Sequence, residues 1–317
     1  MEALVPKNIS KLLWCTALLG IGIHVIAHLR HKKAKLLEDT AQTNYGHRLR
    51  EDALHEAADF QKTFLPQNPL EIGQFQVSGL TRPSDIVNGD FYSFFGVHRR
   101  GTIGMAIGDI TGHGVQAAIF YTWMQHLFRE KSEFATSASE TMYLVENSMD
   151  KTVLKENRGR NRMLVPATWI EVNVNTSLAK VVRAGHTFPV LIDPEGNCQK
   201  ITSGRGMLLN SGYYDDMYSE TSPDSPWLDL DETEIQIPSG WTLLNFTDGL
   251  IETHDCANNL LGEACVFNAI KDFVLFKSNI YTSEELCAML MTLAMNHKGK
   301  AKQHDDITVV AIRNLSA

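Results

Sequence analysis

Cysteine is scarce in this chain, and the cysteines that are present do not form the pattern of a disulfide framework. There are five of them, an odd number, and no two are spaced as C-x-x-C. Such cysteines are typical of free thiols in a reducing compartment. The sequence also lacks an internal repeat and a long low-complexity run. These absences argue against a disulfide-stapled secreted fold and against a repeat architecture.

Positive charge is also in deficit, because 29 Lys and Arg residues face 37 Asp and Glu residues and leave a formal net charge of -8. This acidic balance argues against non-specific binding to nucleic acid, so we expect no nucleic-acid partner. Hydrophobic residues make up 44% of the 317 positions, which is enough for a sizeable core. The length allows either two units or one larger domain with appendages.

Formal charge is missing altogether from residues 12–29, which read LLWCTALLGIGIHVIAHL. A helix of this length rises about 27 Å, close to the roughly 30 Å of a bilayer core. Basic residues crowd positions 30–35, so the positive-inside bias places the C-terminal side in the cytoplasm. We expect a short tail at 1–11 and then a single-pass transmembrane helix, with a buried or interfacial helix as the alternative. His24 and His28 share one face of it, where they pack against a partner helix or bind a haem or metal.

Residues 30–66 read as a charged helical linker. Apolar or small residues recur mostly four positions apart within 33–64, which makes a stripe along one helix face. Two interpretations are open: the helix leans on the following domain, or the stripe forms a homodimer or carries a signal from the membrane. Pro66 and Pro69 end the helix, so the next domain is expected to start at about residue 67.

Residues 67–317 have the texture of one α+β domain. Short apolar strands joined by hairpin turns alternate with pairs of helices, which favours antiparallel sheets with helices packed outside. We expect strands at 75–80, 90–97, 102–110, 167–174, 179–184, 189–192, 198–201, 241–246 and 307–312. We expect helices at 115–130, 137–157, 262–277 and 283–297, and an irregular surface loop at 207–239.

Four aspartates lie where an apolar strand meets a turn, although they are far apart in the sequence. They are Asp90, Asp109, Asp248 and Asp305, the last followed by Asp306. If the strands share a sandwich, their ends can converge, and the carboxylates then repel one another unless a cation neutralises them. Mg²⁺ or Mn²⁺ suits such oxygen ligands, and a pair of ions lowers the pKa of a shared water and polarises a phosphoryl oxygen. Ordinary turn aspartates are the alternative for any one of them.

Five short motifs around these acids occur in an order that resembles a known family. They are Asn-Gly-Asp-Phe-Tyr (88–92), Asp-Ile-Thr-Gly-His-Gly (109–114), Ala-Gly-His-Thr-Phe-Pro (184–189), Thr-Asp-Gly-Leu-Ile-Glu (247–252) and Asp-Asp-Ile-Thr (305–308). The ordered set is similar to the metal-dependent, protein phosphatase 2C-like enzymes, above all to the bacterial branch that includes the sporulation stage II protein E phosphatase. The resemblance covers about residues 56–314.

The resemblance implies an α-β-β-α sandwich, in which helix pairs flank two antiparallel sheets and two Mn²⁺ or Mg²⁺ ions sit at one edge. By position, it implies as metal ligands Asp90, Asp109, the backbone carbonyl of Ile110, Asp248 and Asp305, with Asp306 not a direct ligand. A metal-bridging hydroxide would attack the phosphorus of phosphoserine or phosphothreonine, which needs no nucleophilic Ser or Cys.

The enzyme so implied is a serine/threonine phosphoprotein phosphatase. Its implied partner and substrate is a small phosphorylated regulatory protein, such as an anti-sigma-factor antagonist. Together with the apolar run at 12–29, the resemblance predicts a bacterial cytoplasmic (inner) membrane location, with the phosphatase domain in the cytoplasm.

Three further side chains near these motifs have a functional and a structural interpretation. His113 could protonate the leaving oxygen or orient Asp109. Arg82 could hold the phosphate through two parallel hydrogen bonds or be a surface arginine. His186 follows a hairpin bend and is expected to be structural, packing behind the site.

The chain departs from the family pattern close to the first acid. Asn88 and Ser93 stand where the branch commonly has Gly and Asp. Neither is an expected primary ligand, but Ser93 is expected to weaken the support of the ligands. The usual Pro-Leu-Gly signal is also missing around 207–210. The alternative function is therefore a catalytically weak pseudophosphatase that acts as a signalling or binding module.

Overall fold

The computed structural model describes residues 30, 32–33, 35, 51–99, 101–112, 115–153, 163–202, 206, 208–210 and 230–315. The chain divides into two compact units, Met1–Ala53 and Leu54–Ala317, and the second contains the strands described below. The expected transmembrane helix at 12–29, with His24 and His28, and most of the expected linker up to residue 50 lie outside the described residues. Within the described ranges, no helix combines the length and the apolarity that crossing a bilayer requires.

Two antiparallel sheets form the centre of the second unit. The six-stranded sheet has the order β1-β2-β11-β10-β7-β8, and the five-stranded sheet has the order β3-β4-β5-β6-β9. The six-stranded sheet consists of β1 (Leu70–Ile72), β2 (Phe75–Arg82), β7 (Val190–Ile192), β8 (Cys198–Lys200), β10 (Thr242–Phe246) and β11 (Ile307–Asn314). The five-stranded sheet consists of β3 (Asp90–Val97), β4 (Thr102–Asp109), β5 (Ala167–Asn173), β6 (Leu178–Ala184) and β9 (Glu232–Gln236).

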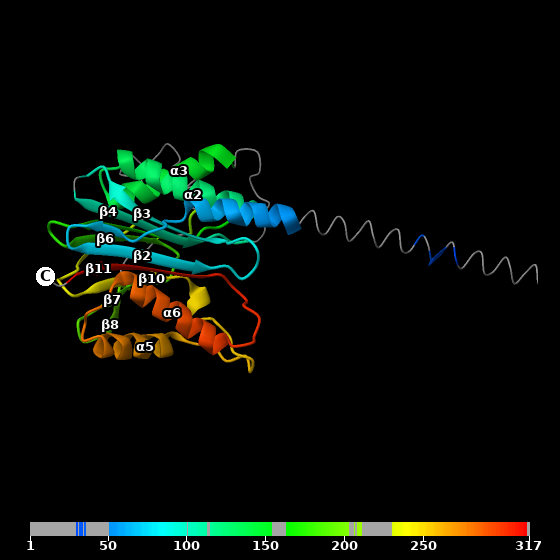
Figure 1. Cartoon of the computed structure of the whole chain (residues 1–317). Helices are drawn as coiled ribbons and strands as arrows, with labels where there is room; N and C mark the ends of the chain where they lie inside the picture. The colour runs from blue at the N-terminus through cyan, green and yellow to red at the C-terminus, as the bar shows by residue number, and fades with distance from the viewer. Residues whose placement is uncertain are drawn as a thin grey trace, which may run out of the picture. The chain divides into compact units, whose positions relative to one another are not determined.

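Two pairs of helices cover the outer faces of the sheets (Figure 1). Helices α2 (Val115–Phe134) and α3 (Ala138–Val153) pack on the five-stranded sheet. Helices α5 (Glu263–Phe276) and α6 (Ser283–Lys298) pack on the six-stranded sheet. The expected α+β sandwich of two antiparallel sheets between helix pairs is therefore confirmed.

Alternation along the strands assigns each side chain to one of two faces. In β3, Tyr92 enters the core between the two sheets, whereas Phe91 enters the core beneath α2 and α3. In β4, Ile107 enters the same inter-sheet core as Tyr92. By the same period of two, Asp90 and Asp109 belong to the inter-sheet face, at the end where β3 begins and β4 ends.

A helical stretch over residues 51–64 leads into the sandwich. Within the second unit, Gln61 of this stretch is buried and bonds both backbone groups of Asn88. Its Nε2 donates to the Asn88 carbonyl at 2.8 Å, and its Oε1 accepts from the Asn88 N–H at 3.0 Å. The helix is thereby tied to the turn that carries Asp90.

The prediction of an irregular loop at 207–239 is wrong over the last part of that range. Strand β9 lies there and pairs with β6 at the edge of the five-stranded sheet. Its sequence, ETEIQ, is mostly polar because an edge strand keeps much of its surface in water. The three-residue strand β1 is a second edge strand that the sequence pattern did not reveal. Residues 211–229 lie outside the described residues.

Candidate metal centre

Asp90 and Asp109 are brought together by the pairing of β3 with β4. Asp90 is the first residue of β3, Asp109 is the last residue of β4, and the two are Cα partners in the antiparallel register. The N–H of Ile110 donates to the carbonyl of Gly89 at 3.2 Å, which joins the turn before Asp90 to the turn after Asp109. The hairpin therefore sets two carboxylates next to each other at one end of the sandwich.

Asp90 is also a point at which the two sheets meet. Its side chain is buried, and Oδ2 accepts a 2.7 Å hydrogen bond from the hydroxyl of Thr247, which follows β10 of the other sheet. The Thr247 hydroxyl oxygen in turn accepts from the N–H of Thr308 in β11 at 3.0 Å. The second oxygen of Asp90, Oδ1, is buried without a hydrogen-bond partner among the described residues. Such an oxygen fits the role of a cation ligand, because a buried carboxylate oxygen otherwise needs a donor.

Asp248 and Asp305 reach the same end of the sandwich from the six-stranded sheet. Asp248 opens the short 3-10 helix η1 (Asp248–Leu250) directly after β10, and Asp305 precedes β11. Gly249 allows these two segments to touch, because a Cβ at this position would lie 1.9 Å from the carbonyl oxygen of Asp306. The glycine is therefore required by the close approach of two chain segments.

Asp306 holds the turn that precedes β3. Its Oδ1 accepts from the N–H of Ser84 at 2.6 Å, and its Oδ2 accepts from the N–H of Gly89 at 2.5 Å. Backbone donors thus occupy both oxygens, so this carboxylate acts as a clamp on the turn that carries Asp90. The bonds fit the expectation that Asp306 is not itself a direct ligand.

The acids act on one another electrostatically. Burial, together with the carboxylates of Asp109 and Asp306, raises the pKa of Asp90 well above its ordinary value. Burial, followed by the charges of Asp305 and Asp248, raises the pKa of Asp109 to about 7. Burial also raises the pKa of Asp305, although this side chain is exposed and water screens the effect. Carboxylates in such a common field need positive charge nearby to be ionised together at neutral pH.

The donor set fits Mg²⁺ or Mn²⁺, because it consists of carboxylate and carbonyl oxygens. In the part of the chain that the structure describes, however, no three Asp, Glu, His or Cys side chains converge closely enough to hold one ion. The acids lie at one end of the sandwich and act on one another electrostatically, but they do not form a closed ligand shell. Side-chain rotations at these strand ends would have to complete such a shell.

A cleft of about 230 Å³ opens beside Asp109 and Asp248. Its opposite wall is the bend between β6 and β7, where His186, Thr187 and Phe188 line it. Because the cleft is open beside two of the acids, it is the space through which a substrate would reach them.

The remaining predicted site residues have different outcomes. Arg82 is exposed at the end of β2, where it is the register partner of Ile307, so it lies at the end of the sheet that carries the acids. The carbonyl oxygen of Ile110 lies 3.3 Å from the place that a Cβ on Gly89 would take, so it borders the turn before Asp90. His113 lies outside the described residues.

The two departures from the family pattern, Asn88 and Ser93, take different positions relative to Asp90. The Asn88 side chain donates to the hydroxyl of Thr81 at 2.6 Å and accepts from the N–H of Asp90 at 3.2 Å, so it shapes the turn. Ser93 lies three residues along β3, on the face opposite to Asp90. Ser93 thus lies away from the face of the acids, and the expected weakening of the ligands through Ser93 stays a prediction.

Thr247, Thr308 and Thr81 support the site and were not among the residues predicted for it. The hydroxyl oxygens of Thr81 and Thr308 lie 2.7 Å apart, next to the bond from Thr308 to Thr247. Strand parity is the signal that could have found them, because Thr308 lies two residues from Val310 of the inter-sheet core.

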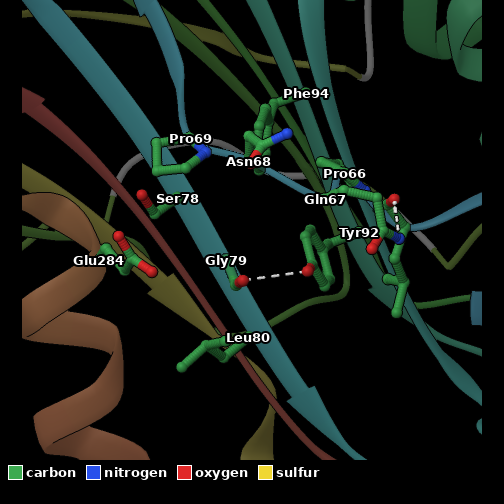
Figure 2. A pocket seen from close by; sticks show the side chains of 11 residues that line it. Pro66, Gln67, Asn68, Pro69, Ser78, Gly79, Leu80, Tyr92, Phe94 and Glu284 are labelled. Atoms are coloured by element: carbon green, nitrogen blue, oxygen red, sulfur yellow. Dashed lines mark hydrogen bonds between the residues drawn. The ribbon is translucent and has the colours of Figure 1, made fainter.

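A second pocket, of about 170 Å³, lies between β2, β3 and residues 65–69 (Figure 2). The hydroxyl of Tyr92 donates to the carbonyl of Gly79 at 3.0 Å inside it. The carboxylate in its lining is that of Glu284, at the start of α6. Since none of the clustered aspartates lines this pocket, it is separate from the candidate metal centre.

Comparison with family models gives a match over most of the chain. Residues 99–314 match the family described as Stage II sporulation protein E (SpoIIE). The match takes in Asp109, Asp248 and Asp305, whereas Asp90 precedes it. The chain therefore belongs to the stage II sporulation protein E family, as its motifs predict.

Two curated relatives and one solved structure agree with this family. Protein IcfG of Synechocystis sp. is 20% identical over 283 residues, which cover 82% of this chain and 41% of that protein. Phosphoserine phosphatase RsbP of Bacillus subtilis is 23% identical over 198 residues, which cover 62% of this chain and 44% of that protein. The chain thus spans less than half the length of these relatives. The SiaA-PP2C domain of Pseudomonas aeruginosa has a TM-score of 0.66 at 19% identity and covers 84% of this chain and 98% of its own.

The solved structure shows the fold of a PP2C domain. Together with the family match, it confirms the class of enzyme that the sequence predicts, a PP2C-type serine/threonine protein phosphatase. The solved structure of RsbX, with a TM-score of 0.51 at 12% identity, is a complex with magnesium.

Proposed function

We propose that this chain is a metal-dependent phosphatase that hydrolyses phosphoserine or phosphothreonine on a small regulatory protein. The observation that carries the proposal is the gathering of Asp90, Asp109, Asp248 and Asp305 from both sheets at one end of a SpoIIE-family sandwich. These carboxylates and the carbonyl of Ile110 would hold two Mn²⁺ or Mg²⁺ ions. When bound, such ions polarise a phosphoryl oxygen and lower the pKa of a nearby water.

Residues of the chain position the ligands and the substrate and supply a proton during the reaction. Thr247 and Asp306 hold Asp90 and its turn in place. The oxygen of a water bonds to phosphorus while that water gives up a proton to solvent, the bond from phosphorus to the serine oxygen breaks, and the serine oxygen takes up a proton. His113 would supply this proton, and Arg82 would hold the phosphate oxygens.

Phosphate release from a phosphoserine peptide by the full chain tests this function. We expect activity only with Mn²⁺ or Mg²⁺, and a loss on the order of 100-fold in Asp248→Asn because a ligand charge is removed. Glu284→Gln is the control, because it removes an acid outside the cluster and should leave the rate unchanged. Asp248→Asn with wild-type activity would contradict the proposal, and metal binding without turnover would favour a binding module instead.

A phosphorylated regulatory protein, such as an anti-sigma-factor antagonist, is the proposed substrate. One relative is named a phosphoserine phosphatase, which supports the choice of phosphoserine. Deleting the gene should raise phosphoserine on one small regulatory protein, measured by phosphoproteomics. An unchanged phosphoserine profile in a strain that normally makes the enzyme would contradict this substrate class.

We also infer that residues 12–29 anchor the chain in a bacterial cytoplasmic membrane, with the phosphatase domain in the cytoplasm. The uncharged run and the basic residues that follow it support this location. The full chain should sediment with membranes, and a chain that lacks residues 1–29 should not. Equal distribution of both chains would remove the support for an anchor.

A homodimer through residues 33–64 is the remaining proposal. Phe60 and Phe64 support it, because they are 58% and 41% exposed on the helical stretch. An apolar groove of about 410 Å³, which Phe60 helps to line, lies between that stretch and α2. Phe60→Ser should shift the sedimentation of the full chain toward the monomer. Phe276→Ser, at an exposed position on α5, should not, and an equal effect of both changes would contradict an interface at 33–64.

A further inference from the structure

His186 lies in the wall of the cleft beside the acids, in the bend after β6. Its residue is only 5% exposed, and it lines the 230 Å³ cleft together with Asp109 and Asp248. Gly185, with a φ of 70°, turns the chain at this point, and Arg183 Nη1 donates to the His186 carbonyl at 2.9 Å. The backbone of the bend is therefore fixed by the turn at Gly185 and by the hydrogen bond to the His186 carbonyl.

One ring nitrogen of His186 is used by its neighbours. Nδ1 lies 3.1 Å from the hydroxyl oxygen of Thr168 and 3.3 Å from that of Thr187. The Thr187 hydroxyl donates its single proton to the carbonyl of Phe246, so it offers only a lone pair to His186. A ring proton on Nδ1 satisfies this contact with Thr187, and Nε2 then carries the lone pair of the neutral ring.

The other ring nitrogen of His186 is buried and makes no such contact with a neighbour. Nε2 has no hydrogen-bond partner in the described part of the chain. Buried polar atoms are normally paired with protein groups or with ordered water. Burial lowers the pKa of His186 to about 3, so the ring is neutral at physiological pH and accepts hydrogen bonds without taking up a proton.

A purely structural role explains Nδ1 but leaves Nε2 unexplained. The sequence predicts that His186 packs behind the site, whereas the structure places it in the lining of the cleft. The unpaired Nε2 of a residue that lines the cleft is the feature that calls for a partner.

We propose that His186 is a further residue of the reaction cleft, whose Nε2 accepts a hydrogen bond from a group that enters beside Asp109 and Asp248. The donor is an O–H or N–H group, either of the attacking water or of the main chain of the phosphopeptide. This inference rests on the phosphatase function proposed above. His186 orients this donor and moves no proton.

Two substitutions separate the two nitrogens of the ring. His186→Asn keeps a donor near Nδ1 and removes the acceptor, whereas His186→Gln keeps an acceptor near Nε2 and removes the Nδ1 donor. With the full chain, Mn²⁺ and a phosphoserine peptide, we expect kcat/KM to fall about tenfold or more in His186→Asn and about threefold or less in His186→Gln. The opposite order, with His186→Asn close to the wild type, would overturn the proposal.

The substrate para-nitrophenyl phosphate distinguishes the two possible donors, because it has no main chain. A loss in His186→Asn with both substrates assigns the donor to the water, and a loss with the peptide alone assigns it to the substrate N–H. Equal rates of all three chains on both substrates would overturn the proposal. A wild-type chain that is inactive on both substrates would count against the phosphatase function itself.

Nitrogen NMR of the wild-type imidazole ring tests the proposal without any variant and without turnover. Between about pH 6 and 8 we expect a neutral ring with its proton on Nδ1. Addition of Mg²⁺ and orthovanadate, an analogue of phosphate, should shift the Nε2 resonance of His186. A proton on Nε2, or an Nε2 resonance that does not move, would overturn the inference even if both variants fail to fold.

Discussion

At the scale of single residues, the hydroxyl of Thr247 connects Asp90 to the six-stranded sheet. It donates to Asp90 and accepts from the N–H of Thr308. Thr247→Val would leave both partners without this bond, and we expect Mn²⁺ affinity to fall about 10- to 100-fold in calorimetric titration. Thr292→Val is the matched control, because Thr292 is exposed and its hydroxyl donates to the Ala288 carbonyl within α6. Equal affinities of the two variants would contradict this role of Thr247.

Gly249 is a second residue whose size decides the geometry of the site. A Cβ here would meet the Asp306 carbonyl at 1.9 Å, so Gly249→Ala must push the segment before β11 away from η1. We expect a loss of about 3 kcal/mol in the free energy of unfolding, measured with urea. Gly96→Ala is the control, because its Cβ would lie 3.6 Å from Ile72 in ordinary contact. If the two variants unfolded at the same urea concentration, the close approach at Gly249 would not be essential.

At the scale of elements, the helical stretch at 51–64 is coupled to the metal centre through Gln61. Gln61→Ala would leave the buried N–H and carbonyl of Asn88 unpaired, so we expect a loss of about 1–3 kcal/mol in stability. Mn²⁺ affinity should also fall, because the turn before Asp90 is loosened. Lys62→Ala is the control, because Lys62 is exposed and should affect neither quantity. A Gln61→Ala chain with unchanged Mn²⁺ affinity would show that the contact is only structural.

The elements that sequence patterns predict well are those with a clear buried face. β3 and β4 have near-continuous apolar runs, and their hairpin explains why Asp90 and Asp109 meet. β9 could not be found in this way, because its edge position leaves a polar sequence with no period to detect. The pairing of β9 with β6 depends on contacts between residues about fifty positions apart, which no local pattern encodes.

At the scale of the whole molecule, the charge on the acids makes stability depend on pH and on metal. The pKa of Asp109 rises from 3.8 to about 7 on folding, so between these values the folded chain binds more protons than the unfolded chain. Its stability in EDTA should therefore fall as pH rises from about 4 to 7 and stay low above that. We expect Tm at pH 8 to be lower than at pH 5 by about 3 °C or more, and Mg²⁺ to restore it at pH 8.

Asp109→Asn is the control for this pH dependence, because asparagine cannot ionise. Its Tm in EDTA should change less between pH 5 and pH 8 than that of the wild type. A wild-type Tm that rises over this interval without metal would contradict the assignment.

The sandwich as a whole could be predicted, but the arrangement of the site only in part. Motif order and the resemblance to a family predicted which aspartates belong together. The bond from Asp90 to Thr247 joins residues 157 positions apart on different sheets, and only the packing of the sheets reveals it. His186 was predicted to be structural for the same reason, since the sequence does not show that the bend after β6 lines a cleft beside the acids.

The bond between Asp90 and Thr247 has a consequence for how the chain becomes active. Because one partner comes from each half of the sandwich, a folding intermediate with a single complete sheet would have most of its backbone ladder and none of its activity. Activity would then appear in one step, when the two sheets pack against each other. A ligand that separated the two sheets slightly would inactivate the chain without contacting any of the carboxylates.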